Sequence, residues 1–410
     1  MPKLAIKGGA PVREKPFTTW PLYDEREKEL LLEALESREW GRMNGKMNDT
    51  FEEKFSQFQR VKHTTAVCNG TVALRIALFA AGVGPGDEVI LPSYTFVATA
   101  TSVIEANAIP IMADIEIDTF NIDPESVEQL ITDRTKAIMP VHFGGAPADM
   151  DRIREIARRH NLVVIEDAAQ AQGSEWQGTR VGAIGDVGTF SFQLSKNMTS
   201  GEGGALVTGD NNMHEKIRSF YNCGRKPGHP WYFHFEISSN LRLSEFQAAV
   251  LIAQLEREEE NLAKRIENAN YLDELLSKIE GIEPIIYPEQ VKSSYYLYIF
   301  KYDKGGFGDL SKERFVEALN AEGIPVMPGY PFPLYRQPLF VEGRYWQKNC
   351  PFSCQFYGRD VDYSKIYHPK AEQACEMGLW LPNFVLLGER KDVEDVAEAI
   401  LKVQRFFGEV

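Results

Sequence analysis

The sequence predicts an α/β fold built on a mostly parallel sheet, with a second, smaller α+β domain towards the C-terminus. In the first half of the chain, short apolar strands alternate with helical segments. This alternation is typical of a parallel sheet covered by helices on both faces. From about residue 245 the pattern changes to a long charged helix followed by an aromatic, strand-like run. The 410 residues suffice for one large and one smaller domain.

Helices in the first half are predicted where apolar residues recur regularly among charged or alanine-rich ones. The predicted helices cover residues 25–37, 72–81, 95–106, 124–131 and 151–160. Short apolar runs between them predict buried strands at residues 88–91, 109–112, 137–141 and 162–165. Because parallel sheets bind ligands at the carboxyl ends of their strands, the residues just after each strand are the candidates for function.

The second half of the chain predicts the smaller domain. A helix is expected over residues 245–276, a strand within 294–301, a helix near 311–321 and a closing helix over 391–407. We therefore expect a large domain over residues 1–270, including an N-terminal arm, and a small C-terminal domain over residues 271–410.

Composition excludes several classes of protein. With 45 basic and 59 acidic residues the net charge is −14, which argues against nucleic-acid or anionic-membrane partners. The first residues lack the apolar run of a secretory signal, and no stretch reaches the roughly 18 apolar residues of a membrane span, so we expect a cytoplasmic protein. Five scattered cysteines indicate no disulfide framework. Cys350 and Cys354 lack a second ligand pair, so no metal site is expected.

Three segments carry chemistry. Asp167 follows an apolar strand, where it is either a functional carboxylate or a helix N-cap. Lys196 lies on a polar turn before a glycine-rich bend, where it is either a reactive amine or an ordinary exposed lysine. The turn at Gly70 and Thr71 opens directly onto a helix, and such a turn either binds phosphate or simply caps the helix. Together they supply the phosphate cradle, amine and carboxylate that pyridoxal 5'-phosphate requires.

The motifs resemble those of the DegT/StrS-type aminotransferases, which act on keto sugars and keto cyclitols. The resemblance covers nearly the whole chain and is carried by residues 8–13, 92–99, 166–171, 191–196, 201–204 and 240–249. It implies the pyridoxal-phosphate-dependent transferase fold of type I, with a mostly parallel seven-stranded sheet in the large domain.

The resemblance also implies roles for single residues. Lys196 is the covalent anchor of the cofactor and the catalytic base, and Asp167 pairs with the pyridine nitrogen. The remaining cofactor-binding residues are Gln170 beside the ring, Phe96 stacked on its face, Gly70, Thr71 and Ser191 at the phosphate, and Asn240. Because Asn240 would reach the cofactor of a neighbouring subunit, the protein is expected to be a homodimer with shared sites.

Two positions depart from the family pattern. Ser238 stands where the family often has glycine two residues before the asparagine, and Tyr296 stands where it often has histidine. Relatives that have become dehydratases carry histidine in place of the lysine, so the retained Lys196 favours a transaminase.

Residues 192–201, 330–340 and 378–382 are similar to the branch of glutamine:scyllo-inosose aminotransferases. The expected reaction moves an amino group from L-glutamine or L-glutamate to a keto cyclitol such as scyllo-inosose by a ping-pong Schiff-base mechanism. Three alternatives are a nucleotide-linked 3- or 4-keto sugar as acceptor, an aminohydroxybenzoate-forming activity, and a regulatory protein that binds the cofactor without turnover.

The substrate pocket has weaker candidates. His142, Tyr330 and Tyr335 are expected to contact substrate, although tyrosines near a proline-rich segment are more often packing residues. Arg42 and Arg225 could meet a carboxylate or could be surface charges.

Overall fold

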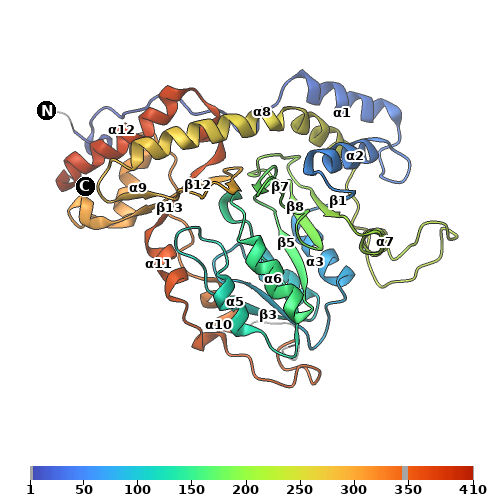
Figure 1. Ribbon diagram of the computed structural model, residues 1–410. Helices are drawn as coiled ribbons and strands as arrows, with labels where there is room; N and C mark the ends of the chain where they lie inside the picture. Colours follow the sequence, from blue (N-terminus) through green and yellow to red (C-terminus); the bar gives the residue numbers. More distant parts are fainter. Residues whose placement is uncertain (1–2, 344–349, 410) are drawn as a thin grey trace.

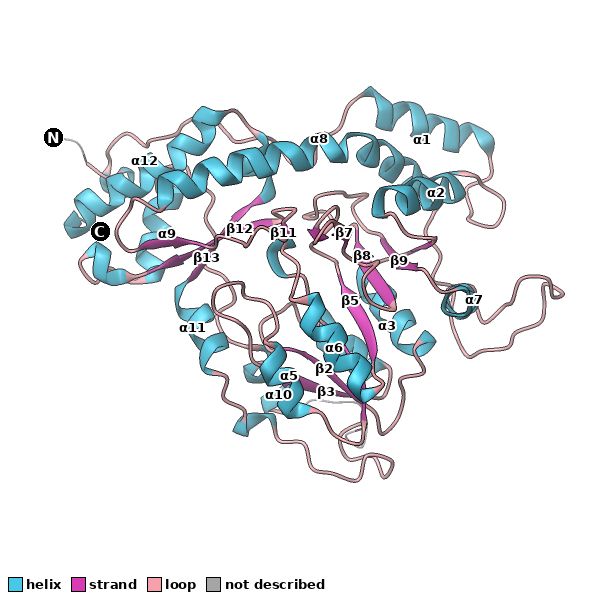
Figure 2. Ribbon diagram, viewed as in Figure 1, coloured by secondary structure: helices cyan, strands magenta, loops and turns pink. Residues whose placement is uncertain are grey.

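The centre of the molecule is a seven-stranded sheet. The computed structural model describes residues 3–343 and 350–409. The strands run in the order β1-β9-β8-β5-β4-β2-β3, and among the described residues only β9 runs against the others. Their bounds are β1 His63–Val67, β2 Glu88–Pro92, β3 Ile109–Ala113, β4 Thr135–Ile138, β5 Val163–Asp167, β8 Val187–Ser191 and β9 Gly204–Thr208. Figure 2 shows the strands between layers of helices. The predicted mostly parallel, seven-stranded sheet is confirmed.

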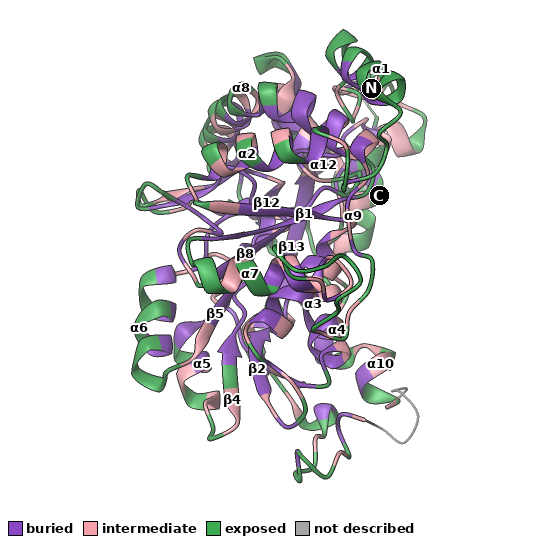
Figure 3. Ribbon diagram, turned by 90° about the vertical axis from the view of Figure 1, so that its right-hand side faces the viewer, coloured by how far each residue is buried: buried purple, intermediate pink, exposed green. Residues whose placement is uncertain are grey.

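Both faces of the sheet are buried. On β2, Ile90 belongs to one core cluster, whereas Val89 and Leu91 belong to another on the opposite face. Figure 3 shows α5 and α6 on one side of the sheet and α3 and α4 on the other. Their bounds are α3 Gly70–Ala80, α4 Ala98–Glu105, α5 Pro124–Leu130 and α6 Met150–His160. Burial on both faces explains why the strands read as continuous apolar runs.

One helix begins later than the sequence predicts. The prediction starts it at residue 95, but α4 begins at Ala98. Residues 93–97 instead continue β2 as a loop, because the N–H of Ser93 donates to Ala113 and the carbonyl of Ser93 accepts from Leu334. These tertiary hydrogen bonds outweigh local helix propensity there.

The longest helix of the described residues, α8 Glu245–Leu276, runs along one side of the molecule (Figure 1). Its limits are those predicted, and its start is fixed by Ser244, which caps the first turn in a capping box with Gln247. The helices that contact it are α1 Glu25–Ser37, α2 Met47–Gln59 and α12 Arg390–Phe406.

The C-terminal part is built on a three-stranded antiparallel sheet of β10 Ile282–Pro284, β12 Leu297–Tyr302 and β13 Gly378–Pro382. Its core cluster includes α9, Lys312–Ala321, together with α12 and Leu4 from the N-terminal segment. Leu334 and Tyr363 pack instead in the cluster of α3 and α4. The division at residue 270 falls inside α8 and stays a prediction.

Smaller elements complete the chain. A second three-stranded sheet pairs β11 Val291–Lys292 with β6 Glu175–Trp176 and β7 Thr179–Arg180. The remaining α-helices of the described residues are α7 Asn211–Phe220, α10 Pro338–Val341 and α11 Pro369–Met377. Within residues 3–343 and 350–409, no helix is long and apolar enough to span a bilayer.

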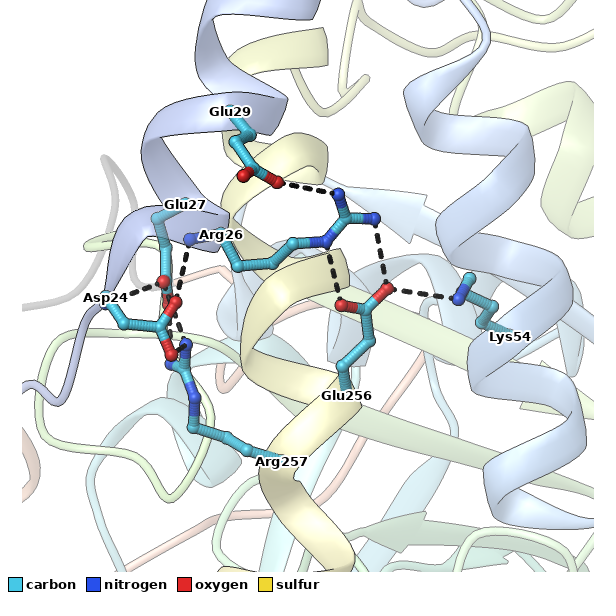
Figure 4. Close-up of polar contacts among 7 residues, drawn as sticks. All are labelled: Asp24, Arg26, Glu27, Glu29, Lys54, Glu256 and Arg257. Atoms are coloured by element: carbon cyan, nitrogen blue, oxygen red, sulfur yellow. Dashed lines mark hydrogen bonds and ion pairs between the residues drawn. The ribbon is translucent and has the colours of Figure 1, made fainter.

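Ion pairs connect the N-terminal helix α1 to α8. Figure 4 shows Arg257 of α8 between Asp24 and Glu27, and Glu256 between Arg26 and Lys54. Arg257 Nη1 lies 2.5 Å from Glu27 Oε1, and both side chains are largely buried. Burial alone would raise the pKa of Glu27, but hydrogen bonds from Arg257 and from the backbone of Asp24 lower it to about 2. This ion pair fixes where the preceding segment enters the molecule.

Candidate active site

The sheet brings the three predicted segments to one edge. Asp167 is the last residue of β5 and Ser191 is the last residue of the adjacent parallel strand β8. β1 points the same way and ends at Val67, directly before the turn that opens α3. The carboxyl ends of parallel strands share an edge, so these groups face a common space.

The turn before α3 is shaped to hold an anion. Asn69 caps the helix, since its side-chain oxygen accepts from the N–H of Val72 at 2.8 Å. Gly70 and Thr71 are the first helical residues, so their N–H groups have no acceptor within the helix. A Cβ on Gly70 would lie 2.7 Å from Cβ of Ser191, so only glycine lets the turn approach the serine this closely. The unpaired N–H groups of the turn therefore lie beside the serine hydroxyl, an arrangement typical of anion-binding helix starts.

Asp167 is a buried carboxyl group with defined partners. It is 4% exposed, accepts from the Thr99 hydroxyl at 2.9 Å and from the N–H of Ala169 at 3.2 Å. Burial raises the pKa of Asp167, while the Thr99 hydrogen bond and the charge of Lys196 act in the opposite direction. The segment that follows forms turns and not a helix, so Asp167 is not an N-cap. Its side chain is instead held by Thr99 and by the backbone of Ala169 at the end of β5.

Lys196 is half-buried on a tight turn. Its N–H donates to the carbonyl of Gln193, and its Nζ lies 4.2 Å from the ring centroid of Tyr296. The hydroxyl groups of Ser195 and Tyr296 are 2.9 Å apart. The indole nitrogen of Trp20 donates to the carbonyl of Leu194 at 2.7 Å. Lys196 is therefore held by contacts and is unlike a solvated surface lysine.

Two further predicted residues flank this space. Phe96 is 58% exposed and lies one turn before Thr99, whose hydroxyl binds Asp167. Gln170 is buried, and its side-chain oxygen accepts from the N–H of Gly144 at 2.8 Å. The open face of Phe96 is available for stacking, whereas Gln170 orders the loop after β4.

Tyr330 belongs to an aromatic wall. Its ring packs edge-on against Tyr94 at 5.1 Å and Trp380 at 4.9 Å between centroids. Burial raises the pKa of Tyr330, and the charges of Tyr296 and Asp167 add to that effect. Tyr296, whose ring lies against Lys196, packs in the same cluster as these rings, so the wall lies next to the lysine turn.

His142 and Tyr335 lie in the protein interior. The two ring nitrogens of His142 pair with Glu166, at 2.9 Å, and with the N–H of Ala148. The Tyr335 hydroxyl donates to Glu372 at 2.5 Å and accepts from the N–H of His368. Their polar atoms are thus engaged within the protein, and their substrate roles stay predictions.

The segment that ends at Asn240 leaves the body of the molecule as a long loop after α7 (Figure 1). Asn240 is exposed, while the next residue, Leu241, accepts from the N–H of Cys68 beside the phosphate turn. Ser238, which replaces the family glycine, donates its hydroxyl hydrogen bond to the carbonyl of Phe220. This bond joins the end of the loop to the last residue of α7, and the Asn240 side chain stays exposed at the surface.

Sequence reasoning missed two contributors to the site. Trp20 reaches the lysine turn from 174 residues away, which no local pattern reveals. Thr99 was part of a recognised motif, but only the packing of α4 against β5 makes it a partner of Asp167. Arg42 is engaged elsewhere, in a buried ion pair with Glu52 at 2.8 Å.

The chain resembles known proteins over nearly its full length. Residues 21–401 match the DegT/DnrJ/EryC1/StrS aminotransferase family. A protein of Streptoalloteichus tenebrarius that carries the provisional name L-glutamine:3-amino-2,3-dideoxy-scyllo-inosose aminotransferase is 40% identical over 98% of each chain. The L-glutamine:2-deoxy-scyllo-inosose aminotransferase of Streptomyces kanamyceticus is 38% identical over 98% of this chain and 96% of its own.

Among solved structures, 3-amino-5-hydroxybenzoic acid synthase superposes with a TM-score of 0.86 and 36% identity, over 94% of this chain and 98% of its own. These likenesses confirm the resemblance carried by the motifs, the type I fold and the transaminase activity. The chain therefore belongs to the DegT/DnrJ/EryC1/StrS aminotransferase family.

Proposed function

We propose that the protein uses pyridoxal 5'-phosphate to move an amino group from L-glutamine to a keto cyclitol of the scyllo-inosose type. The observation that carries the proposal is the arrangement of one amine, one buried carboxyl group and one anion cradle along a single sheet edge. These are Lys196, Asp167 and the turn of Gly70 against Ser191.

The residues present fit the cofactor. When bound, pyridoxal phosphate supplies an aldehyde carbon for amino groups and a ring that withdraws electrons. The N–H groups of Gly70 and Thr71 and the Ser191 hydroxyl would hold its phosphate. Asp167 would keep the ring nitrogen protonated, with Thr99 stabilising the carboxylate. Phe96 would cover one face of the ring.

Lys196 would carry out the proton transfers. It would hold the cofactor at rest and, once freed by the donor's amino group, would act as the base that takes the α-proton of the donor. The contacts of Trp20 and Ser195 hold the turn that carries this amine. Orientation of this kind is worth several orders of magnitude in rate.

The acceptor is proposed from the relatives and from the pocket wall. Two relatives named for scyllo-inosose derivatives and L-glutamine match over nearly the whole chain. The partly exposed ring of Tyr330, backed by the buried rings of Tyr94 and Trp380, offers an apolar face against which the C–H face of a ring polyol could pack. A nucleotide-linked keto sugar is the competing acceptor class and is included in the test below.

The working unit is proposed to be a homodimer. The loop after α7 exposes apolar side chains that a monomer would leave in water, with Ile237 99% exposed. The other exposed apolar residues of this loop are Trp231, Tyr232, Phe233 and Phe235. Contiguous apolar surface of this kind marks an interaction site, and a second copy would bring Asn240 to its partner's cofactor.

The acceptor screen tests the proposal. Full-length protein loaded with pyridoxal phosphate is mixed with L-glutamine and with either scyllo-inosose or a nucleotide-linked 3- or 4-keto sugar, and aminated products are identified by mass spectrometry. We expect amination of the inosose. Amination of the nucleotide sugar alone would reassign the acceptor, and no amination with any donor would favour a regulatory role.

A further inference from the structure

We propose that Tyr296 is a positioning residue for Lys196, with its ring holding the lysine amine and its hydroxyl tying that ring to the lysine turn. The inference rests on the proposed function, because it assigns a place to the amine whenever Lys196 is not bonded to the cofactor. Tyr296 is half-buried and lies directly before β12.

The ring faces the amine. Lys196 Nζ lies 4.2 Å from the ring centroid of Tyr296, which is the geometry of a cation–π contact. The ring's electron-rich face attracts an ammonium group. A lysine stem has four rotatable bonds and would otherwise sample many orientations.

The hydroxyl contact has a defined direction. The Ser195 hydroxyl has one hydrogen, and it donates this hydrogen to the side-chain oxygen of Gln193 at 2.8 Å. Tyr296 therefore donates to the oxygen of Ser195, 2.9 Å away. The chain of hydrogen bonds runs from Tyr296 through Ser195 to Gln193, all within the turn that carries Lys196.

The backbones on both sides of this contact share one anchor. The carbonyl of Ser294, two residues before Tyr296, accepts from Asn197 at 3.0 Å and from the buried Arg265 at 2.8 Å. Asn197 follows Lys196 directly, and it accepts in turn from Asn383 at 2.7 Å. The segments that carry the ring and Lys196 are therefore joined by the same buried hydrogen bonds, which fix the distance between them.

The chemical consequence concerns the free amine. In the proposed reaction Lys196 would act as a free amine that takes a proton from the donor and later gives it back, so the resulting ammonium group needs a fixed position. The ring of Tyr296 provides that position. Loss of the ring should slow proton transfer without weakening the binding of the cofactor or the donor.

The first test uses the protein without cofactor, so it does not depend on activity. Full-length wild type and Tyr296→Leu are labelled with limiting acetic anhydride, and modification of Lys196 is measured by mass spectrometry relative to the exposed Lys136. We expect Lys196 to react about threefold faster in Tyr296→Leu, because the amine loses its partner. An unchanged labelling ratio in a folded variant that still binds pyridoxal phosphate overturns the inference and leaves the proposed function intact.

The second test uses the loaded enzyme. Tyr296→Leu should lower kcat about tenfold with KM for L-glutamine changed less than about twofold, and the kinetic isotope effect with α-deuterated glutamine should rise. A change in KM that is as large as the fall in kcat, with no change in the isotope effect, contradicts a positioning role. If even the wild type fails to bind pyridoxal phosphate, the proposed function itself fails.

Milder variants keep the inference testable should Tyr296→Leu not fold. Tyr296→Phe keeps the ring and loses the tether, and Ser195→Ala loses the tether from the other side. Each should change Lys196 labelling by a similar, smaller factor than the leucine variant, and the double variant should match the singles because both remove one hydrogen bond. Fully additive effects contradict the tether.

Discussion

The indole nitrogen of Trp20 donates a 2.7 Å hydrogen bond to the carbonyl oxygen of Leu194, two residues before Lys196. The segment that carries Trp20 is itself bound to α8, because the carbonyl of Leu22 accepts hydrogen bonds from Gln254 and Arg257. The N-terminal segment thus reaches the lysine turn, 174 residues further along the chain. We infer that this segment helps to hold the lysine turn in its working shape.

Trp20→Phe tests this contact. It keeps an aromatic ring but removes the donor to Leu194, so we expect a several-fold weaker affinity for pyridoxal phosphate and a lower kcat, equivalent to about 1 kcal/mol. Cofactor titration by absorbance measures the effect. Trp40→Phe is the matched control, since Trp40 donates a similar bond to Leu35 in α1, away from the site. Equal effects of both substitutions would contradict the inference.

Glu27 should make the protein sensitive to acid. Its pKa in the folded state is about 2, below the value of an unpaired glutamate, so the stability it contributes is complete above about pH 4.5 and is lost as pH falls towards 2. Glu27→Gln should therefore lower the free energy of unfolding at pH 7 by about 2 kcal/mol, with a smaller difference at pH 3. Urea unfolding at both pH values measures this.

The control for that prediction is Glu29→Gln. Glu29 pairs with Arg26 on the exposed face of α1, where an ion pair contributes little, so we expect a change below about 0.5 kcal/mol. A Glu27 variant with no pH dependence would show that the Arg257 pair does not anchor the N-terminal helix.

The sequence predicted those elements whose limits are set locally. The helices at Glu25–Ser37 and Glu245–Leu276 begin where predicted because Asp24 and Ser244 cap their first turns, and such caps are visible in the sequence. The start of α4 was predicted three residues early, because distant backbone hydrogen bonds at Ser93 hold the loop that precedes it. Capping residues can thus be recognised from the local sequence, whereas the start of α4 depends on tertiary hydrogen bonds that outweigh local helix propensity.

Substitutions of Thr99 and Asp167 should lower activity to different extents. Thr99→Val removes one hydrogen bond to the carboxylate, so the pKa of Asp167, already raised by burial, should rise further. We expect kcat to fall about tenfold and the acid limb of the pH profile to move to higher pH. Asp167→Asn should cost about 100-fold or more.

Thr95→Val is the control for this series, because Thr95 contacts the Thr99 hydroxyl but not Asp167. It should change kcat less than about threefold. A Thr99 variant with an unshifted pH profile would mean that the carboxylate does not need its hydroxyl partner.

Asp273 should lower stability at neutral pH. Burial raises its pKa to about 6, against a 2.6 Å hydrogen bond from Tyr298, so the folded state favours the protonated form. The stability of the protein therefore declines as pH rises from about 4 to 6. Asp273→Asn keeps an acceptor for Tyr298 without the charge, and it should be more stable at pH 8 by about 1 kcal/mol, with no gain near pH 4. Thermal unfolding at the two pH values, with exposed Glu274→Gln as control, measures this.

The site was only partly readable from the sequence. Asp167, Lys196 and Gly70 could be proposed because each sits at a strand end or a helix start, positions that a parallel sheet brings to one edge. The contacts of Trp20 and Tyr296 with the lysine turn join segments more than 100 residues apart, and no periodicity encodes them.

The role of Lys196 has the most direct test. Full-length protein is loaded with pyridoxal phosphate and reduced with borohydride, which makes a lysine–cofactor bond permanent, and the modified peptide is sequenced by mass spectrometry. We predict a single adduct on Lys196, absent from Lys196→Ala and abolished when L-glutamine is added before the reduction. An adduct on another lysine, or one that L-glutamine leaves unchanged, would contradict the account.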